Sequence, residues 1–456
     1  MFLSQYKLYA VAFLAIILNS CSNKAPQAAA QDQNFPPALK TDKTDQNQTH
    51  QPQRLPEFIC QDRENDPAQI NKPIVIMLSI DGFRADYIKK YNPKYLKMLS
   101  QNGLYSTGLI PSFPSHTFPN HYSIATGRVP GHHGIVSNKF YDKARKKYYS
   151  MADISTSRDG SWYDGMPIWN VVEKNNLIAH TYHWVGSEAH VNQMDPTCYI
   201  NYSDSIKLNE KVSKTIEWLK LPDKKRPHLI TLYTPVVDSA GHYFGPDSTE
   251  VKNAIMETDN EIGRLWNYIK SSSLKVNLIL VSDHGMQNTD LNKVIYINEL
   301  LDNPKDVNAF ALSDRGPVTM LYSDDASMIK NTYLQLKQKE NHYKVYLKGE
   351  TPTELKLDHP DRIGDIVMIA DMPYYIIDQR LNDQPPRLNK GTHGWHYDNP
   401  EMRGLFIAIG PNIKPKTTLA PFKNIDIYPF IMSILDITTT TPYDGDFKTL
   451  KPYVTH

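Results

Sequence analysis

The apolar run Ile74–Ile80, IVIMLSI, leads directly into Asp81 and decides the class of fold. Its length and its β-branched residues predict a strand, and its nearly continuous apolar character predicts burial on both faces. Similar runs occur at Leu229–Val237, LITLYTPVV, and at Val276–Ser282, VNLILVS. Strands buried on both faces are typical of a parallel sheet that is covered by helices.

The segment between the second and third runs, VKNAIMETDNEIGRLWNYIK, has the periodicity of a helix. Its apolar residues recur at helical spacing: Val251, Ile255, Ile262, Leu265, Trp266 and Ile269. This spacing predicts an amphipathic helix that packs on the sheet. Strand, helix and strand in succession predict an α/β fold with a mostly parallel central sheet and helices on both faces.

Each of the three predicted strands ends at an aspartate: Asp81, Asp238 and Asp283. An aspartate after a strand is commonly a turn residue or a helix cap. Ligands of open α/β sheets, however, bind beyond the carboxyl ends of the strands. Histidines also accompany two of these aspartates, at His242 and His284. We therefore expect the three carboxylates to converge in a site.

A further histidine, His393, lies between two glycines in the segment GTHGW. Carboxylate oxygens and imidazole nitrogens are the ligands that Zn²⁺ takes in sites without cysteine. Two such ions, about 4 Å apart, can bind a phosphoryl group and activate a nucleophile. The pattern therefore indicates metal-assisted phosphoryl transfer.

The segment Ser115–Gly127, SHTFPNHYSIATG, predicts a short helix with a hydroxyl at its beginning. Pro119 suits a position just inside the helix and Gly127 a position just past its end, which makes Thr117 the expected N-cap. Capping is one interpretation of this threonine. The other is nucleophilic attack on a phosphate at the positive end of the helix dipole, with a metal ion lowering the pKa of the hydroxyl.

The composition excludes little by itself. The chain has 456 residues, of which 40% are hydrophobic and 22% charged, as in a globular protein with a large core. A net charge of +1 gives no global preference for nucleic acid or for an anionic membrane. If Cys21 carries a lipid, Cys60 and Cys198 remain, either as a disulfide in an oxidising compartment or as separate thiols.

The N-terminus has the pattern of an export signal. Lys7 precedes the apolar run LYAVAFLAIILNS, which is too short for a transmembrane helix. The run ends in Leu18–Cys21, LNSC, which resembles a bacterial lipobox, and Ser22 suits sorting to the outer membrane. We expect a lipoprotein-type signal peptide over residues 1–21 and a lipid anchor as the contact with the membrane. An ordinary cleaved signal with an incidental cysteine is the alternative.

The residues after the signal are mostly Gln, Asn, Asp, Thr, Ala and Pro up to about residue 56. A segment of this composition cannot bury a core and predicts a flexible tether. We expect the tether to span residues 22–69 and a catalytic domain to span residues 70–456. The protein would act on the periplasmic side or at the cell surface.

Together the motifs resemble the nucleotide pyrophosphatase/phosphodiesterase family of the alkaline phosphatase superfamily. In chain order they are IDGFRADY around Asp81, TFPNHYSIATG from Thr117, PGHHGIVSN up to Asn138, DSAGHYFGP from Asp238, VSDHGM around Asp283 and THGWH around His393. The resemblance covers nearly all of the folded part of the chain. It implies an alkaline-phosphatase-like fold and a hydrolase.

The resemblance also implies two Zn²⁺ ions and a role for each motif. One ion would be bound by Asp81, Thr117, Asp283 and His284, and the other by Asp238, His242 and His393. Thr117 would form a phospho-threonine intermediate, which metal-bound water hydrolyses to release a nucleoside 5′-monophosphate. Asn138 and the backbone N–H of Phe118 would donate to a phosphate oxygen.

Substrate recognition is implied less directly. The base would stack between Phe118 and Tyr202, although Tyr202 could equally be a core or rim residue. An aromatic clamp favours a flat base, because stacking tolerates any base identity. We expect a small nucleotide or phosphodiester as the substrate and no specific nucleic-acid duplex as a partner. Aromatic rings also bind quaternary ammonium groups, which makes a choline-type phosphodiesterase the alternative. His116 and His121 fall outside the implied ligand set and are expected to be structural or rim residues.

Other classes fit the sequence less well. A sulfatase would need a cysteine or serine where Thr117 stands. A phosphomonoesterase would be expected to have an arginine or a third set of metal ligands beside the motif, and none is evident in the sequence. A metal-binding surface lipoprotein without turnover would be expected to have lost a ligand or the nucleophile. All seven implied ligands and Asn138 are present.

Overall fold

Strand β2 (Ile74–Ile80) has all seven residues buried and lies within the central sheet. The computed structural model describes residues 57–380 and 388–455, which belong to one compact unit. From edge to edge the sheet has the order β1 (Phe58–Cys60), β7 (Cys198–Ile200), β6 (Ala179–Tyr182), β8 (Leu229–Thr234), β2, β9 (Val276–Val281), β18 (Gly404–Ile409), β3 (Leu104–Ile110) and β19 (Thr417–Leu419), with β20 (Phe422–Lys423) beside β3. The five strands from β7 to β9 are parallel, which confirms the predicted mostly parallel sheet.

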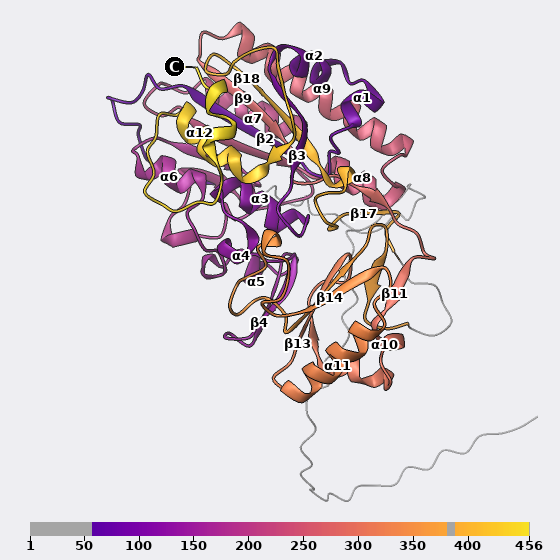
Figure 1. Cartoon of the computed structure of the whole chain (residues 1–456). Coiled ribbons are helices and arrows are strands. Elements are labelled where there is room, and N and C mark those ends of the chain that lie inside the picture. The colour runs from indigo at the N-terminus through magenta and orange to yellow at the C-terminus, as the bar shows by residue number, and fades with distance from the viewer. Residues whose placement is uncertain (1–56, 381–387, 456) are drawn as a thin grey trace, which may run out of the picture. The chain divides into compact units, whose positions relative to one another are not determined.

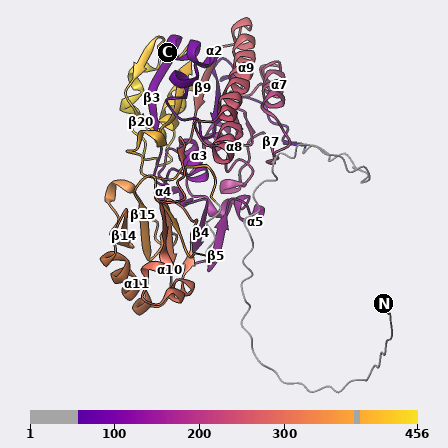
Figure 2. The ribbon, with the colours of Figure 1, turned by 90° about the vertical axis from the view of Figure 1, so that its right-hand side faces the viewer.

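Helices cover both faces of this sheet, as the sequence predicted (Figure 1). Ile76 and Leu78 of β2 pack with α1 (Tyr87–Tyr91), α2 (Lys94–Asn102), α7 (Leu208–Leu219) and α9 (Thr249–Ser271). Val75 and Met77 point to the opposite core, which contains α3 (Thr117–Thr126), α6 (Ile168–Lys174) and α12 (Ile427–Ile434). The side view places α7 and α9 together, away from β3 and β20 (Figure 2).

Two of the predicted element boundaries can be compared directly with the structure. The helix expected between the second and third strands is α9, with Val251, Ile255 and Leu265 buried. The strand expected over Leu229–Val237 is too long, because β8 stops at Thr234 and helix α8 (Val236–Phe244) begins after Pro235. A proline has no N–H for a sheet ladder but is tolerated at the start of a helix.

A second, smaller sheet lies between β9 and β18 in the chain and was not predicted. It has the order β12 (Ala311–Leu312), β13 (Val318–Tyr322), β15 (Ile366–Ala370) and β14 (Tyr343–Leu347), all antiparallel, and packs with α10 (Ile297–Leu300) and α11 (Ala326–Gln338). Shorter elements complete the fold: α4 (Pro130–His133), α5 (Ile154–Ser157), and the strand pairs β4 (Lys139–Asp142) with β5 (Lys147–Ser150), β10 (Gln287–Asn288) with β17 (Gly391–Thr392), and β11 (Val294–Tyr296) with β16 (Tyr375–Ile377). Among the described residues, no helix is long and apolar enough to span a membrane.

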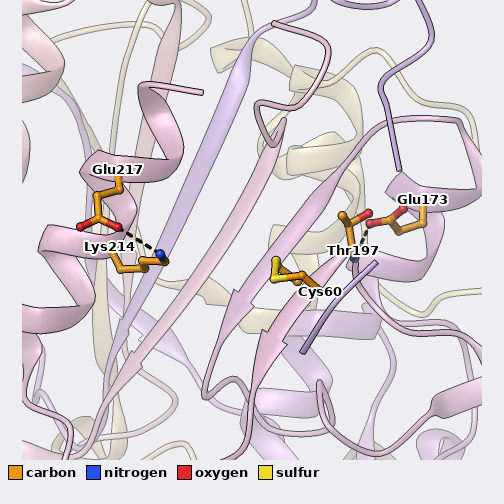
Figure 3. The surroundings of a disulfide bond; sticks show 6 residues. Cys60, Glu173, Thr197, Lys214 and Glu217 are labelled. Carbon is orange, nitrogen blue, oxygen red and sulfur yellow. Dashed lines mark hydrogen bonds and ion pairs between the residues drawn. A yellow bond between two sulfur atoms is a disulfide. The ribbon is translucent and has the colours of Figure 1, made fainter. Parts of the chain in front are cut away.

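The folded chain begins earlier than the boundary that we expected at residue 70. Strand β1 pairs antiparallel with β7, and Cys60 forms a disulfide with Cys198 (Figure 3). Beside the disulfide, the N–H of Thr197 donates to Glu173 at 2.7 Å. The sheet therefore takes in part of the predicted tether. The predicted signal peptide, residues 1–21, and residues 22–56 of the tether lie outside the described residues.

We expect the disulfide to contribute substantially to stability. It joins residues 138 apart, and closing a long loop lowers the entropy of the unfolded chain. Replacing Cys60 and Cys198 together by alanine should lower the free energy of unfolding by about 2–5 kcal/mol. Guanidinium denaturation of the two proteins measures the difference. Equal midpoints for the two proteins, unchanged by a reductant, would contradict this role.

Candidate active site

Asp81 and Asp283 lie together at the carboxyl edge of the central sheet. Strands β2 and β9 are parallel neighbours in a register that pairs Ser79 with Val281, so each aspartate follows its strand at the equivalent position. Both carboxylates are buried, and the N–H of Gly82 donates to Asp283 Oδ1 at 3.3 Å. The register alone therefore brings these two carboxylates side by side.

Asp238 and His242 reach the same edge from helix α8 rather than from the end of a strand. They are four residues apart on one helical face, and His242 Nε2 lies 3.4 Å from Asp238 Oδ2. Gly82 permits this approach: it has a φ of +65°, and a Cβ at this residue would lie 2.8 Å from Asp238 Cα. The expected convergence of three carboxylates is present, but the element that carries Asp238 differs from the prediction.

His284 and His393 complete the cluster. Antiparallel pairing of β10 with β17 holds the loop after β9 against the segment that contains His393. The two rings stack, with centroids 3.5 Å apart. His284 Nε2 lies 3.0 Å from Asp283 Oδ2 and 3.5 Å from Asp81 Oδ1. His393 Nε2 lies 3.8 Å from Asp238 Oδ1.

The three histidines of the cluster share one orientation. In each, Nδ1 donates to a backbone carbonyl: Gly391 for His242 at 2.7 Å, Gly285 for His284 at 2.9 Å and Ser115 for His393 at 2.8 Å. Because a carbonyl can only accept, Nδ1 carries a hydrogen and Nε2 is the atom left to bind a proton or a metal. All three Nε2 atoms face the carboxylates, which is the arrangement typical of histidines that bind metals.

The carboxylates themselves are incompletely satisfied. Within the described part of the chain, Asp81 Oδ1, Asp238 Oδ1 and Asp283 Oδ2 are buried and accept no hydrogen bond. Burying a charged oxygen without a partner is unfavourable, and a bound cation removes the cost. Carboxylate oxygens together with imidazole nitrogens suit Zn²⁺. The residues present therefore fit the expected metal.

The pKa shifts in the cluster have two causes, burial and the charges of neighbouring side chains. Burial raises the pKa of Asp81 well above its usual value, and the charges of Asp283 and Asp238 raise it further. Burial also raises the pKa of Asp238. For Asp283, burial acts in the same direction, but His284 and His121 outweigh it and hold the pKa well below its usual value. Burial lowers the pKa of His284, but the charge and hydrogen bond of Asp283 outweigh it and raise the pKa above its usual value.

The side chains form two overlapping groups whose ligand atoms lie within 4.8 Å of one another. They are Asp81, Asp283 and His284, and Asp238, His284 and His393. The sequence analysis expected His242 rather than His284 in the second group. In the structure His242 borders that group through its contact with Asp238, and His284 lies between the two groups. The structure thus brings together all six expected aspartate and histidine ligands.

Thr117 is the first residue of α3, and its N-cap is His116, whose backbone is extended. The prediction that Thr117 caps the helix is therefore wrong by one residue, whereas Gly127 ends the helix as expected, with a φ of +66°. The Thr117 Oγ1 atom instead lies 3.2 Å from His284 Nε2. The hydroxyl therefore faces the candidate metal ligands at the positive end of the helix dipole.

The sequence was next compared with known proteins. A family profile described as type I phosphodiesterase/nucleotide pyrophosphatase matches residues 75–396. The chain belongs to this family.

Relatives of known sequence extend the match. A pyrophosphatase/phosphodiesterase of Schizosaccharomyces pombe, described as uncharacterized, is 36% identical over 404 residues, which are 85% of this chain and 82% of the relative. Human ectonucleotide pyrophosphatase/phosphodiesterase family member 1 is 32% identical over 399 residues, which are 84% of this chain. The match spans only 42% of that human protein.

Solved structures confirm the alkaline-phosphatase-like fold. Human ectonucleotide pyrophosphatase/phosphodiesterase 5 has a TM-score of 0.77 and 27% identity, over 84% of this chain and 100% of that one. The murine protein, solved as an inactive threonine-to-alanine variant in complex with AMP, has the same TM-score and 28% identity over the same shares.

Asn138 lies beside the first turn of α3. Its Oδ1 accepts the N–H of Phe118 at 3.0 Å. The sequence analysis expected both groups to donate to a phosphate oxygen. In the structure the Phe118 N–H is already bonded to Asn138, so only the Nδ2 of Asn138 remains for an incoming phosphate unless that bond opens.

The expected aromatic pair is partly in place. Tyr202 is 39% exposed, which excludes the core alternative, and its hydroxyl donates to Asp204. Its ring lies 6.2 Å from that of Tyr233. Phe118 is half-buried on the first turn of α3. No ring contact joins Phe118 to Tyr202 in the described chain, so their stacking on one base stays a prediction.

Two further residues contact the candidate metal ligands, and the sequence analysis missed the first of them. The hydroxyl of Tyr233, on β8, donates to Asp81 Oδ2 at 2.7 Å. His121 was expected to be a structural or rim residue; it is buried with Nδ1 3.3 Å from Asp283 Oδ2, which excludes the rim. The spacing of His121, four residues after Thr117 on one helix, was the available signal. Nothing in the sequence distinguishes Tyr233 from the other tyrosines.

Proposed function

We propose that this chain is a two-zinc nucleotide phosphodiesterase/pyrophosphatase that releases nucleoside 5′-monophosphates through a phospho-threonine at Thr117. One observation carries the proposal. The Thr117 hydroxyl begins helix α3 and lies 3.2 Å from His284, within a cluster of buried carboxylates and histidines. A hydroxyl that only served packing would have no reason to face candidate metal ligands.

The reaction that this arrangement supports has two steps. In the first, Thr117 Oγ1 loses its proton and attacks the phosphorus, the Oγ1–P bond forms, and the bond to the leaving alcohol or phosphate breaks, with a proton taken up by the leaving oxygen. In the second, water attacks the same phosphorus, the Oγ1–P bond breaks, the nucleoside monophosphate leaves, and a proton from the water restores the Thr117 hydroxyl. Asn138 Nδ2 would donate to a nonbridging oxygen in both steps, which stabilises the charge that develops there. The N-terminus of α3 favours the same negative charge.

The expected zinc ligands follow the two groups in the cluster. Asp81, Asp283, His284 and Thr117 would bind one ion, and Asp238, His242 and His393 the other. When bound, the two ions supply the positive charge that neutralises the phosphate and lowers the pKa of the attacking hydroxyl. Tyr233 and the backbone carbonyls that accept from the histidines hold these ligands in place.

A nucleotide is the proposed substrate because a murine relative was solved with AMP. The exposed ring of Tyr202 and the half-buried ring of Phe118 would bind the base by stacking. A choline-type ester is the second candidate, and one observation favours it. Carboxylates of Glu188 and Asp204 accept from the backbone and the hydroxyl of Tyr202, and negative charge beside an aromatic ring also suits a quaternary ammonium.

We further propose that the protein is exported and anchored by a lipid on Cys21, which becomes the first residue after cleavage of the signal before it. The disulfide between Cys60 and Cys198 supports an oxidising compartment. The tether would then join the anchor to a catalytic domain that begins near residue 57. In this arrangement the membrane is contacted only through the anchor, at the periplasmic side or the cell surface.

The proposal is tested by the kcat/KM of the zinc-loaded chain from residue 54 onward on three p-nitrophenyl esters. These are the esters of thymidine 5′-monophosphate, of phosphorylcholine and of phosphate. We expect preference for the thymidine ester. Preference for phosphorylcholine would move the substrate to lipid headgroups, and preference for the phosphate ester would overturn the diesterase assignment.

A further inference from the structure

We propose that His121 is a positioning residue that fixes the metal ligand Asp283 relative to the turn of α3 that carries Thr117. The contacts of His121 follow from the geometry alone, whereas its effect on catalysis rests on the proposed function. His121 is fully buried and contacts residues of three separate elements. Nδ1 lies 3.0 Å from the carbonyl oxygen of Thr117 and 3.3 Å from Asp283 Oδ2. Nε2 lies 2.8 Å from the hydroxyl of Ser79.

These contacts leave one arrangement of protons for a neutral His121 ring. The Thr117 carbonyl can only accept, so Nδ1 carries the hydrogen. Nε2 then accepts from the hydroxyl of Ser79. The N–H dipole of Nδ1 therefore points toward the carbonyl of Thr117 with Asp283 Oδ2 close beside it. The ring therefore lies against both the Asp283 carboxylate and the first turn of α3, and it limits how far either can move relative to the other.

Among the described contacts, the hydroxyl of Ser79 bonds only His121. Ser79 is the only polar residue of β2, IVIMLSI, and it is fully buried. A buried hydroxyl is unfavourable without a partner, and the partner is His121. The serine hydroxyl can donate to Nε2 in the tautomer that the Thr117 carbonyl imposes, and the histidine links β2 to α3 and to the carboxylate that follows β9.

Neighbouring rings prevent His121 from turning. Trp184 and Tyr233 pack against it edge to face, with centroids 5.4 Å and 5.0 Å away. The indole N–H of Trp184 also donates to the backbone carbonyl of His121. Tyr233 binds Asp81 through its hydroxyl. Tyr233 therefore contacts Asp81, His121 contacts Asp283, and the two rings pack against each other. This packing limits the movement of the two carboxylates.

His121→Leu removes this contact, whereas His121→Asn keeps a donor close to the place of Nδ1. We expect the leucine variant to lower kcat and the affinity for zinc by about ten- to a hundredfold with little change in KM, as for other residues that orient metal ligands. The asparagine variant should recover most of both. His133→Leu is the matched control, because His133 is also fully buried and bonds a serine hydroxyl, Ser123 Oγ at 3.0 Å, but has no contact with the cluster. It should lower the melting temperature without lowering kcat.

A spectroscopic measurement separates this proposal from the proposed function. Long-range ¹H–¹⁵N spectra of the zinc-free protein at about pH 8, where free histidine is neutral, should show the His121 proton on Nδ1. Ser79→Ala, a milder change should the leucine variant fail to fold, is expected to leave the proton on Nδ1, to remove the hydrogen bond at Nε2 and to weaken zinc binding. A proton on Nε2 in the wild type, or full kcat and zinc affinity in the folded variants at position 121, would overturn the proposal. Absence of diesterase activity in the wild type would instead count against the proposed function, since the spectrum and the zinc titration need no substrate.

Discussion

Replacing Thr117 by alanine is expected to lower kcat/KM on the preferred diester by more than about a hundredfold. The substitution removes the attacking oxygen, and loss of a nucleophile costs enzymes several orders of magnitude. The fold should persist, because among the described contacts the Thr117 hydroxyl bonds only His284, and alanine favours a helix. Zinc content should stay close to that of the wild type, since the aspartate and histidine ligands remain. A murine relative with a threonine-to-alanine substitution is described as inactive, which supports the expectation.

Thr215→Ala is the matched control for this variant. Thr215 is buried on α7, and its hydroxyl bonds only the backbone carbonyl of Lys211, at 2.9 Å. The Thr215→Ala variant should retain the activity of the wild type. Thr117→Ser keeps a hydroxyl and should retain part of the wild-type activity. The covalent mechanism would be wrong if Thr117→Ala, purified and zinc-loaded, kept more than one part in a hundred of the activity, or if rapid quenching of the wild type trapped no phosphate on Thr117.

The sequence predicted the features that depend on short stretches of chain. The strand Ile74–Ile80 was predicted because an apolar run of seven residues needs a sheet buried on both faces. Asp81 and Asp283 follow their strands at equivalent positions, so the parallel register alone makes them neighbours. Gly127 was placed correctly because the end of α3 needs a left-handed conformation that glycine adopts without strain.

Errors arose where a local pattern permitted two structures. The run LITLYTPVV is apolar throughout, and a short apolar run does not distinguish the end of a strand from the first turn of a helix. Pro235 marks the change from β8 to α8, and it was the signal that could have placed Asp238 on a helix. The cap of α3 was misplaced by one residue, because His116 is not a residue type that predicts an N-cap.

Other features depend on distances across the fold. Neither the pairing of Cys60 with Cys198 nor the position of His284 between the two ligand groups follows from spacing along the chain. The small sheet was missed because its strands are short and interrupted by loops. Tyr233 became a candidate only once its hydroxyl was seen at Asp81. Such contacts are set by the packing of separate elements, which no single stretch of sequence contains.

Removing the metal is expected to have an effect as large as removing the nucleophile. Dialysis against a chelator should lower kcat/KM by about a thousandfold or more, because metal ions contribute several kcal/mol to stabilising charge in the transition state. Added Zn²⁺ should restore activity and raise the melting temperature, since a ligand that binds only the folded state stabilises it. Mg²⁺ should restore little, because three of the six aspartate and histidine side chains proposed as ligands are imidazoles and Mg²⁺ prefers oxygen.

Variants that each remove a side chain from one of the two ligand groups test whether both groups bind zinc. Asp283→Ala removes a ligand from the first group and Asp238→Ala from the second, so each should bind one zinc ion fewer than the wild type by elemental analysis. Thr117→Ala should take up zinc normally after chelation and still remain inactive, which distinguishes loss of the nucleophile from loss of the metal. Recovery with Mg²⁺ alone would show that the zinc assignment is wrong. Normal zinc content in both aspartate variants would show that these carboxylates are not ligands, and the three buried oxygens without hydrogen bonds would then need another partner.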